Sequence, residues 1–298
     1  MNFFKLVNKL KRKQSSLILY CLLDRIPIIV FGDDSNKIDD LLLDLSELVD
    51  FRKEIVFNTD FISNIEYNNL IQNEDIDYNT QRIQIRCPDD VSFEALNQFE
   101  NFRSWLMGIN ITKQNENLQY IKGLIKKKIS IFLNILMTAN KVSVEFEGVN
   151  TKLLDLSLER EILQKISQDT EKSIIRMKRV LSDRIKLNNI DDDLIQTLLD
   201  FNAEKNELKR NIFKKEIQIF YSGSKRAFFI LSRLNLLNNL EIKTKIGSKT
   251  LLETIDFEEV PIGRIISFIK HEWGEDYSNL IENNNKIFIV DKIDSLWG

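Results

Sequence analysis

The sequence is poor in the residues that interrupt regular secondary structure: it holds three prolines and nine glycines among 298 residues. These residue types mark turns and linkers, so their scarcity argues against a β-sandwich and against a linker rich in proline or glycine. We therefore expect long regular elements. Hydrophobic residues make up 43% of the chain, which is enough to bury ordinary cores.

Cysteine and histidine are also scarce, with only Cys21, Cys87 and His271. These counts exclude a disulfide framework and a zinc site of the usual four-ligand kind, and they fit a reducing compartment. A Ser-His-Asp or Cys-His catalytic group would have to use His271. Because His271 lies beside Glu272 in a predicted helix, with no nucleophile close in sequence, we interpret it as an exposed helical residue.

The sequence lacks a long uncharged hydrophobic run. The apolar stretch Leu17–Phe31 is interrupted by Asp24, Arg25 and Pro27. It has about 15 residues, whereas a helix that spans a membrane needs about 20. The same interruptions argue against a secretory signal, because no small-residue cleavage site follows them. We expect a cytoplasmic protein.

Two helical patterns lie in the middle of the chain, between Leu153 and Tyr221. The first has Leu158, Ile162, Ile166, Thr170, Ile174, Met177, Leu181 and Ile185 at steps of three or four, and the second has Leu194, Leu198, Phe201, Leu208, Ile212 and Ile219. Such spacing places each set on one helix face, nearly as in a coiled coil. The polar residues 188–192 can end the first helix and cap the second. We predict a long antiparallel helical hairpin, able to form homo- or hetero-oligomers.

Strand-length apolar runs alternate with helical patterns before the hairpin. Strands are predicted at Ile26–Phe31, Glu54–Phe57 and Arg82–Cys87, with helices over Ile38–Val49 and along Ala95, Phe99, Phe102 and Leu106. The strand–helix–strand spacing predicts a parallel βαβ unit whose first two strands are neighbours. We assign residues 17–112 to this α/β domain.

The rest of the chain is divided into a helical region with the hairpin, residues 113–222, and a winged-helix-like α+β domain, residues 223–298. Helices are predicted at Leu118–Met137, Arg226–Leu237, Ser248–Ile255 and Pro261–Trp273, and strands at Lys141–Glu147, Leu240–Ile246 and Lys286–Val290. The last helix would direct Gly263, Arg264, Ser267, Lys270 and His271 outward. Residues 248–298 hold five bases and ten acids, a net charge of −5, so we expect this domain to bind a protein rather than DNA.

The turn after the first predicted strand lies where α/β sheets bind phosphates. Gly32, Ser35 and Lys37 stand in the position of a P-loop, but the motif GxxxxGK[ST] is incomplete. The glycine before the lysine and the hydroxyl after it are both missing. These three residues are therefore cofactor-binding candidates for a nucleotide only under an alternative hypothesis.

Acidic residues follow the first two predicted strands. Asp33, Asp34 and Asp60 lie just beyond the carboxyl ends of strands that we expect to be neighbours. Carboxylates from adjacent strands can converge on one Mg²⁺ with oxygen ligands. The alternative use of Asp33 or Asp34 is to cap the helix that follows. The Mg²⁺ site would accompany the nucleotide in a switch-like α/β domain.

The first residues form a short basic amphipathic pattern. Met1–Lys13 carries five bases interleaved with Phe3, Phe4, Leu6, Val7 and Leu10. Such a segment, which we assign to residues 1–16, can lie on an anionic membrane surface. It can equally pack its apolar side chains on the domain behind it, and we favour that interpretation.

The sequence thus predicts a mixed α/β, helix-rich protein of three parts. Our first hypothesis is a non-catalytic intracellular interaction or scaffold protein that presents two small domains on a helical hairpin to a protein partner. The alternative is a degenerate nucleotide- or Mg²⁺-binding switch domain. The second alternative is a winged-helix regulator that binds DNA.

Overall fold

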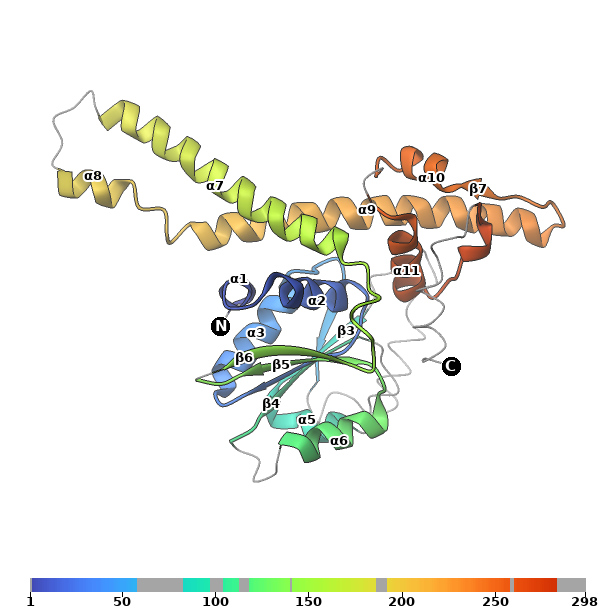
Figure 1. Cartoon of the computed structure of the whole chain (residues 1–298), viewed down its shortest axis with the longest axis horizontal. Helices are drawn as coiled ribbons and strands as arrows, with labels where there is room; N and C mark the ends of the chain where they lie inside the picture. The colour runs from blue at the N-terminus through green and yellow to red at the C-terminus, as the bar shows by residue number, and fades with distance from the viewer. Residues whose placement is uncertain are drawn as a thin grey trace.

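A computed structural model describes residues 2–57, 83–96, 104–112, 118–139, 141–185, 192–257 and 260–282. It is a mixed α/β protein, rich in helix, in which a six-stranded sheet lies beneath a long helical rod (Figure 1). The rod extends past the sheet at one end and carries the C-terminal helices at the other. Among the described residues, no helix is long and apolar enough to cross a membrane.

The sheet has the strand order β2-β3-β4-β1-β5-β6. Its strands are β1 (Ile28–Gly32), β2 (Lys53–Val56), β3 (Ile83–Cys87), β4 (Trp105–Asn110), β5 (Phe132–Met137) and β6 (Val142–Glu147). The first five run parallel, and β6 pairs with β5 in the antiparallel direction. The predicted adjacency of the first two strands is wrong, because β3 and β4 lie between β1 and β2.

Strand β1 is the buried centre of the sheet, as its continuous apolar run predicted. Successive side chains of a strand point to opposite faces. Accordingly, Ile28 and Val30 belong to the core on one face, whereas Ile29 and Phe31 belong to the core on the other. Both faces are covered by helices, which is why β1 needs no polar residue.

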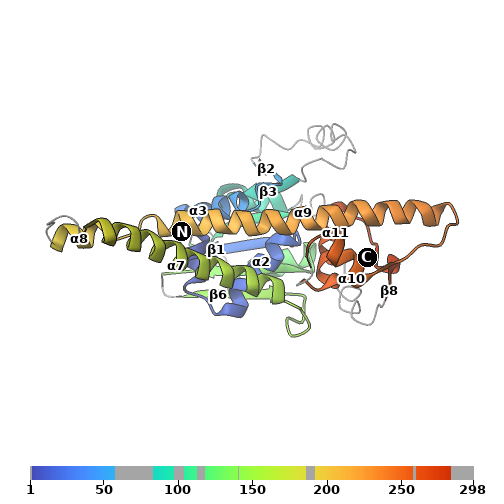
Figure 2. The same ribbon diagram turned by 90° about the horizontal axis from the view of Figure 1, so that it is seen from above.

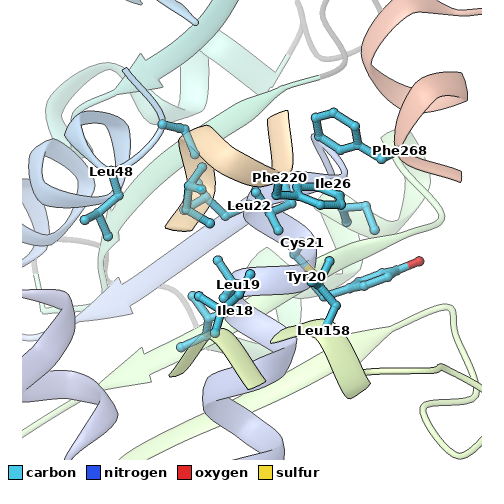
Figure 3. Close-up of a cluster of buried hydrophobic side chains, with 14 of the residues drawn as sticks. Ile18, Leu19, Tyr20, Cys21, Leu22, Ile26, Leu48, Leu158, Phe220 and Phe268 are labelled. Atoms are coloured by element: carbon cyan, nitrogen blue, oxygen red, sulfur yellow. The ribbon is translucent and has the colours of Figure 1, made fainter. Parts of the chain in front are cut away.

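The first face carries α1 (Phe3–Val7), α2 (Arg12–Leu23), α3 (Ser35–Glu47) and the base of the rod, and the second carries α5 (Ser92–Ala95) and α6 (Leu118–Lys128). Figure 3 shows the first core, in which side chains of α2 meet Leu48 after α3, Leu158 and Phe220 of the rod and Phe268 of the C-terminal helices. One continuous apolar core therefore joins the sheet to the rod and the C-terminal part.

Two stretches that we predicted to be helical contain strands in the structure. Of the pattern along Ala95, Phe99, Phe102 and Leu106, Ala95 ends the short α5 and Leu106 belongs to β4, whereas Phe99 and Phe102 lie outside the described residues. Likewise, the pattern of Leu118–Met137 ends as a helix at Lys128, and its last six residues form β5. Because β5 and β6 complete the sheet of β1, that sheet continues past the domain boundary that we predicted at residue 112.

The rod consists of α7 (Ser157–Ile185), α8 (Asp192–Leu198) and α9 (Lys205–Asn239). The stripe predicted for α7 is buried at five positions, from Leu158 to Ile174. The second arm is not one helix, because the Asp200 side chain accepts the Asn202 backbone N–H and turns the chain between α8 and α9. Figure 2 shows the two arms side by side along the molecule.

Helix α9 continues through Ser222-Gly223-Ser224, where we predicted a break and a domain boundary. Gly223 and Ser224 are buried inside the helix. A Cβ at Gly223 would lie 3.3 Å from the Phe257 ring, so glycine permits the close approach of that ring. The helix therefore belongs to both the rod and the C-terminal part.

The C-terminal part contains α10 (Ser248–Thr254), α11 (Ile262–Trp273), the 3₁₀ turn η3 (Ser278–Leu280) and the two-residue strands β7 (Ile246–Gly247) and β8 (Ile281–Glu282). The two strands pair in parallel, so an antiparallel wing is not formed by the described residues. The strand predicted at Leu240–Ile246 is reduced to β7, and the one predicted at Lys286–Val290 lies outside the described residues.

Helix α11 begins after Pro261, as predicted, but it is buried on most sides. Arg264 and Ser267, which we expected to point outward, are each 6% exposed. A recognition helix must offer such side chains to a DNA groove. In the described α11, Arg264 and Ser267 instead contact buried carboxylates, and Lys270 pairs with Asp276 at 2.8 Å.

The N-terminal helix packs its apolar face inside the protein. Phe3 and Phe4 stack edge-on against Phe213 of α9, at ring-centroid distances of 5.8 and 6.0 Å. The backbone N–H of Phe3 also donates a hydrogen bond to Asp44 of α3, at 2.6 Å. The apolar side chains of Met1–Lys13 that would enter a membrane are therefore used in the core.

Candidate functional site at the carboxyl edge of the sheet

At the carboxyl ends of the neighbouring strands β1 and β4, the chain continues to opposite faces of the sheet. Strand β1 leads into α3 on one face, whereas the helices that follow β3 and β4 lie on the other face. In open α/β sheets, ligands bind at such a switch point because the diverging loops leave a crevice. The residues predicted from the sequence after β1 lie at this edge.

Three strand ends contribute to one polar network there. The side-chain amide of Asn110, at the end of β4, donates to the Ser35 hydroxyl at 2.8 Å. The Ser35 hydroxyl in turn donates to the Asp89 carboxylate beyond β3, at 3.0 Å. Thr112 donates its backbone N–H and its hydroxyl to the side-chain oxygen (Oδ1) of Asn110. This network orients Ser35, one of the predicted residues, toward two partners that we did not predict.

Gly32 is explained by packing rather than by phosphate binding. A Cβ at this position would lie 2.9 Å from Ile38 Cγ1 and 3.0 Å from the Met137 carbonyl oxygen. Gly108 of β4 is crowded by the same side chain, since its Cβ would lie 2.6 Å from Ile38 Cγ2. The two glycines let α3 approach the sheet closely through Ile38.

The N-terminus of α3 is already capped by a carboxylate of this chain. Asp34 accepts the backbone N–H of Lys37 at 3.2 Å, as predicted for a cap, and pairs with the Lys37 ammonium at 2.9 Å. The hydrogen bonds from Lys37 lower the pKa of Asp34. Asp33 accepts the backbone N–H of Ala139 at 2.7 Å. A phosphate at this helix end would meet Asp34 where it needs N–H donors.

The predicted Mg²⁺ ligands do not come from neighbouring strands. Asp33 and Asp34 follow β1, and Asp60 lies outside the described residues. Strands β1 and β2 are separated by two others, which places them roughly 14 Å apart at the usual strand spacing. No group of three or more histidine, cysteine, aspartate or glutamate residues that could hold a metal ion occurs in the part of the chain that the structure describes.

Sequence reasoning missed Asp39, Asp89 and Asn110. Burial raises the pKa of Asp39, and the nearby Asp89 and Asp90 carboxylates raise it further. One Asp39 carboxylate oxygen is buried with no hydrogen-bond partner among the described residues. Their positions in the sequence could have indicated two of them, because Asp89 follows a strand and Asn110 ends one. The arrangement can hydrogen-bond a polar ligand, and its acidity disfavours an anionic one.

A second polar group is buried where α2, α7 and α11 meet. The Arg264 guanidinium of α11 pairs with Asp24 at 2.6 Å and with Glu159 of α7 at 2.8 Å. It also lies over the rings of Tyr20 and Phe220, 4.9 and 5.5 Å from their centroids. One arginine thus links the α/β core, the rod and the C-terminal part.

The two carboxylates that share Arg264 differ in their pKa. Burial by itself raises the pKa of Asp24, but the Arg264 charge and the His271 hydrogen bond outweigh it and bring the pKa to about 2. At Glu159, burial dominates and raises the pKa although Arg264 opposes it. Asp24 is therefore the carboxylate that Arg264 stabilises most in its charged form.

His271 is part of this group, and our prediction that it is exposed is wrong. Its Nδ1 lies 3.2 Å from Asp24 and 3.4 Å from the Ser267 hydroxyl, and its side chain is 15% exposed. Ser267 also donates to Asp24 at 3.2 Å. In a catalytic triad the serine and the carboxylate contact opposite ring nitrogens. Here both contact Nδ1, which favours a structural role.

A second buried ion pair lies on the same helix. The Arg52 guanidinium donates to the Glu272 carboxylate at 2.7 Å and to the carbonyl oxygens of Leu22 and Leu23 at 2.7 and 2.6 Å. Arg25 approaches the same carboxylate at 3.8 Å. We call these residues, with those around Arg264, the junction cluster: Asp24, Arg25, Arg52, Glu159, Arg264, Ser267, His271 and Glu272.

An open cleft of about 460 Å³ lies beside the junction cluster, between α7, α9 and the segment before α11. Its floor is apolar and includes Leu158, Ile162 and Val260. The Lys165 ammonium and the Glu216 carboxylate pair at 2.8 Å on its rim. This pair joins the two arms of the rod, so the cleft is a packing feature of the hairpin base.

Comparisons of this sequence with protein-family models, with curated proteins and with solved structures gave no match.

Proposed function

We propose that this chain is a non-catalytic interaction protein, an adaptor whose α/β body and winged-helix-like C-terminal module hold a helical rod toward a protein partner. The rod tip, which we define as residues 175–185 of α7 with Leu194–Leu198 of α8, extends beyond the body (Figure 1). At 1.5 Å per residue, α7 is about 43 Å long, so its distal half is far from the sheet.

The observation that carries the proposal is a change along α7. Up to Ile174 the apolar stripe is buried, but no residue of α7 beyond Ile174 is buried. Ile175 and Val180 are each 63% exposed, and Leu194 and Leu198 of α8 are 51% and 45% exposed. Exposed aliphatic side chains gathered at one protruding end are typical of a protein-interaction site.

The charge of the rod tip limits the partner. Arg176 and Arg179 lie between Ile175 and Val180 on the side of α7 that faces away from the buried stripe. Ile175 and Arg179 are four residues apart, as are Arg176 and Val180, so the members of each pair are neighbours on the helix surface. From Arg176 to Arg184 the helix holds four bases and one acid. A helix with aliphatic and acidic residues on one face complements this surface.

The polar groups that were candidates for chemistry already have structural partners. Asp34 caps α3, and Ser267 donates to the carboxylate that also contacts His271. Other bases of the rod pair with acids of the body or of the opposite arm, since Lys214 contacts Asp50 at 2.9 Å. These uses favour an adaptor over a phosphate-binding or hydrolytic protein.

The proposal is tested by photo-crosslinking in cells that contain the protein and its natural partners. A crosslinking amino acid at Ile175 should capture one partner, whereas the same amino acid at Tyr120, which is 56% exposed on α6, should not. The double variant Arg176→Glu/Arg179→Glu should remove the Ile175 adduct without changing the melting temperature. Equal adducts from both positions, or none from Ile175, would contradict the proposal.

A second candidate function is binding of a small polar ligand at the carboxyl edge of the sheet, with Mg²⁺ and Mg²⁺-bound nucleotide as the first ligands to test, because a cation has to offset the acidity of this edge before an anion can bind. It is favoured by the convergence of Ser35, Asp89 and Asn110 from three strand ends at the switch point. A ligand at 100 times its dissociation constant stabilises a protein by about 2.7 kcal/mol. A thermal-shift screen that moves the melting temperature of the native chain but not of Ser35→Ala supports this candidate.

A further inference from the structure

The C-terminal end of α9 and the turn that follows it expose apolar side chains. Exposed fractions are 40% for Phe229, 54% for Leu236, 37% for Leu237, 70% for Leu240 and 54% for Ile242. We call these five residues the α9 end patch. An apolar cluster of this size on the surface marks an interaction site more often than it marks a packing defect.

The patch follows from the helical repeat. Phe229, Leu236 and Leu240 recur at steps of seven and four, which places them on one face of α9. Of the buried residues of the same stretch, Ala227 and Leu231 lie on the opposite face. The helix is therefore apolar on two faces, and Leu236 and Leu240 on the second face are 54% and 70% exposed.

The turn after α9 holds the patch outward. Asn238 accepts the backbone N–H of Thr244 at 2.6 Å and donates to the Thr244 carbonyl at 3.1 Å, while the Thr244 hydroxyl donates to the Leu234 carbonyl at 3.1 Å. These three bonds close the turn that contains Leu240 and Ile242. Its apolar side chains are thus fixed in an exposed position before any partner binds.

Basic residues lie close to the patch in sequence. From Lys225 to Lys249 the chain holds six bases and one acid, although the net charge of the whole chain is −3. Arg226 pairs with Asp256 at 3.6 Å, whereas Arg233, Lys243 and Lys245 are exposed close to the leucines in sequence. The surface therefore combines apolar insertion residues with positive charge.

The position of the patch distinguishes among occupants. In both views of the molecule, the end of α9 and its turn form one extreme of the structure and protrude beyond α10 and α11 (Figures 1 and 2). A second copy of the chain would bring an equal positive charge against this one. A flat bilayer surface accepts a protruding end that carries exposed apolar and basic side chains.

We propose that the α9 end patch attaches this protein to anionic membrane surfaces, with Leu236, Leu240 and Ile242 entering the interface and Arg233, Lys243 and Lys245 contacting lipid phosphates. Interfacial segments bury apolar side chains roughly 5–10 Å deep, and each basic residue near an anionic surface adds to the attraction. The attachment site lies at the opposite end of the molecule from the rod tip, so it is independent of the proposed adaptor function.

Co-sedimentation of the full chain with vesicles tests the proposal. The protein should pellet with phosphatidylcholine–phosphatidylserine vesicles at low salt and stay in solution with phosphatidylcholine alone. The variant Lys243→Gln/Lys245→Gln should partition about 25-fold more weakly, from the contribution of two basic residues. Leu236→Asn/Leu240→Asn should weaken partition at least roughly tenfold, because two apolar side chains no longer enter the interface.

A matched control separates this patch from exposed apolar residues in general. Ile175→Asn/Val180→Asn removes two side chains that are each 63% exposed at the rod tip, and it should pellet like the native chain. Circular dichroism and the melting temperature should be the same for all variants, because every altered residue is exposed.

Three outcomes overturn the proposal. The first is a native chain that does not pellet with anionic vesicles at low salt. The second is a Leu236→Asn/Leu240→Asn variant that is folded and pellets as the native chain does. The third is a protein partner that binds the native chain but not that variant, when neither chain binds vesicles. The patch would then be a protein-binding site.

Discussion

At the junction cluster three carboxylates face three guanidinium groups in the interior, whereas at the two ends of the rod bases outnumber acids at the surface. The buried acids Asp24, Glu159 and Glu272 are each 2% exposed or less. At the rod ends, Val180 and Leu240 lie open beside arginine and lysine. Ionic and aliphatic side chains thus contact partners inside the protein at the junction cluster, whereas at the two ends of the rod they are exposed at the surface.

This difference separates what holds the protein together from what it presents. A buried charge must have a partner, since an unpaired one strongly destabilises the fold, so the junction cluster fixes α2, α7 and α11 in one arrangement. Exposed aliphatic and basic residues contribute little to stability. Substitutions at the junction should therefore change stability, and substitutions at the ends should change binding.

The largest expected effect is at Arg264. Arg264→Met leaves Asp24 and Glu159 buried without their shared cation, and we expect the free energy of unfolding to fall by about 3–5 kcal/mol. Urea unfolding followed by circular dichroism measures this loss. As a control, Arg179→Met at the rod tip should change it by no more than about 0.5 kcal/mol. Similar losses for both variants would remove the distinction between the two regions.

The two carboxylates of Arg264 should differ from each other. The pKa of Asp24, about 2 in the folded chain, lies below its ordinary value of 3.8, so its ionised form adds about 2 kcal/mol of stability. That contribution is present above about pH 4 and is lost as the pH falls toward 2. The raised pKa of Glu159 has the opposite effect on stability, because protonation of Glu159 favours the folded state.

We therefore expect Asp24→Asn to destabilise the protein by about 2 kcal/mol at pH 7 and by less near pH 3. Glu159→Gln, which keeps an acceptor for the Arg264 Nε–H, should have the smaller effect at pH 7. Urea unfolding of the three proteins at both pH values makes the comparison. A larger loss for Glu159→Gln at pH 7 would reverse the assignment of the principal ion pair.

Replacing a glycine with alanine should have smaller effects on stability, which differ between a packed and an open position. Gly108→Ala places a Cβ 2.6 Å from Ile38 and should destabilise the protein by about 1–3 kcal/mol through overpacking. At Gly123, inside α6, a Cβ meets nothing within 4 Å. Gly123→Ala should stabilise the protein by up to about 1 kcal/mol, since alanine favours helix. Thermal unfolding monitored by circular dichroism tests both, and equal effects would contradict the packing role of Ile38.

Patterns of burial were predictable from the sequence, whereas long-range contacts were not. The apolar run of β1, the stripe of α7 as far as Ile174 and the start of α11 at Pro261 are all local signals, and the structure confirms them. Leu106 was misassigned because apolar residues three or four apart in a short run fit a helix, yet Leu106 lies in β4 and pairs with Ile28 of β1. Tertiary pairing decided between the two.

The candidate site shows the same limit. Asp34 as a helix cap was predictable, because a cap depends on residues three positions apart. The partners of Ser35 come from the ends of β3 and β4, and the sequence does not reveal the strand order that unites them. His271 was misread for the same reason: Asp24, the carboxylate it shares with Ser267, lies 243 positions before that serine in the chain.

The smallest expected effect on stability is at the rod tip. Ile175 and Val180 are each 63% exposed, so replacing both with asparagine removes little buried apolar surface and should change the free energy of unfolding by no more than about 0.5 kcal/mol. In a thermal scan this corresponds to a shift of roughly 1–2 °C. A crosslinking amino acid at Leu194, which is 51% exposed at the rod tip, should nevertheless no longer capture the proposed partner in this variant, because the partner no longer meets an aliphatic surface. A loss of stability above about 1 kcal/mol would mean that these side chains pack within the protein, and the rod tip would then not be the surface that this protein presents.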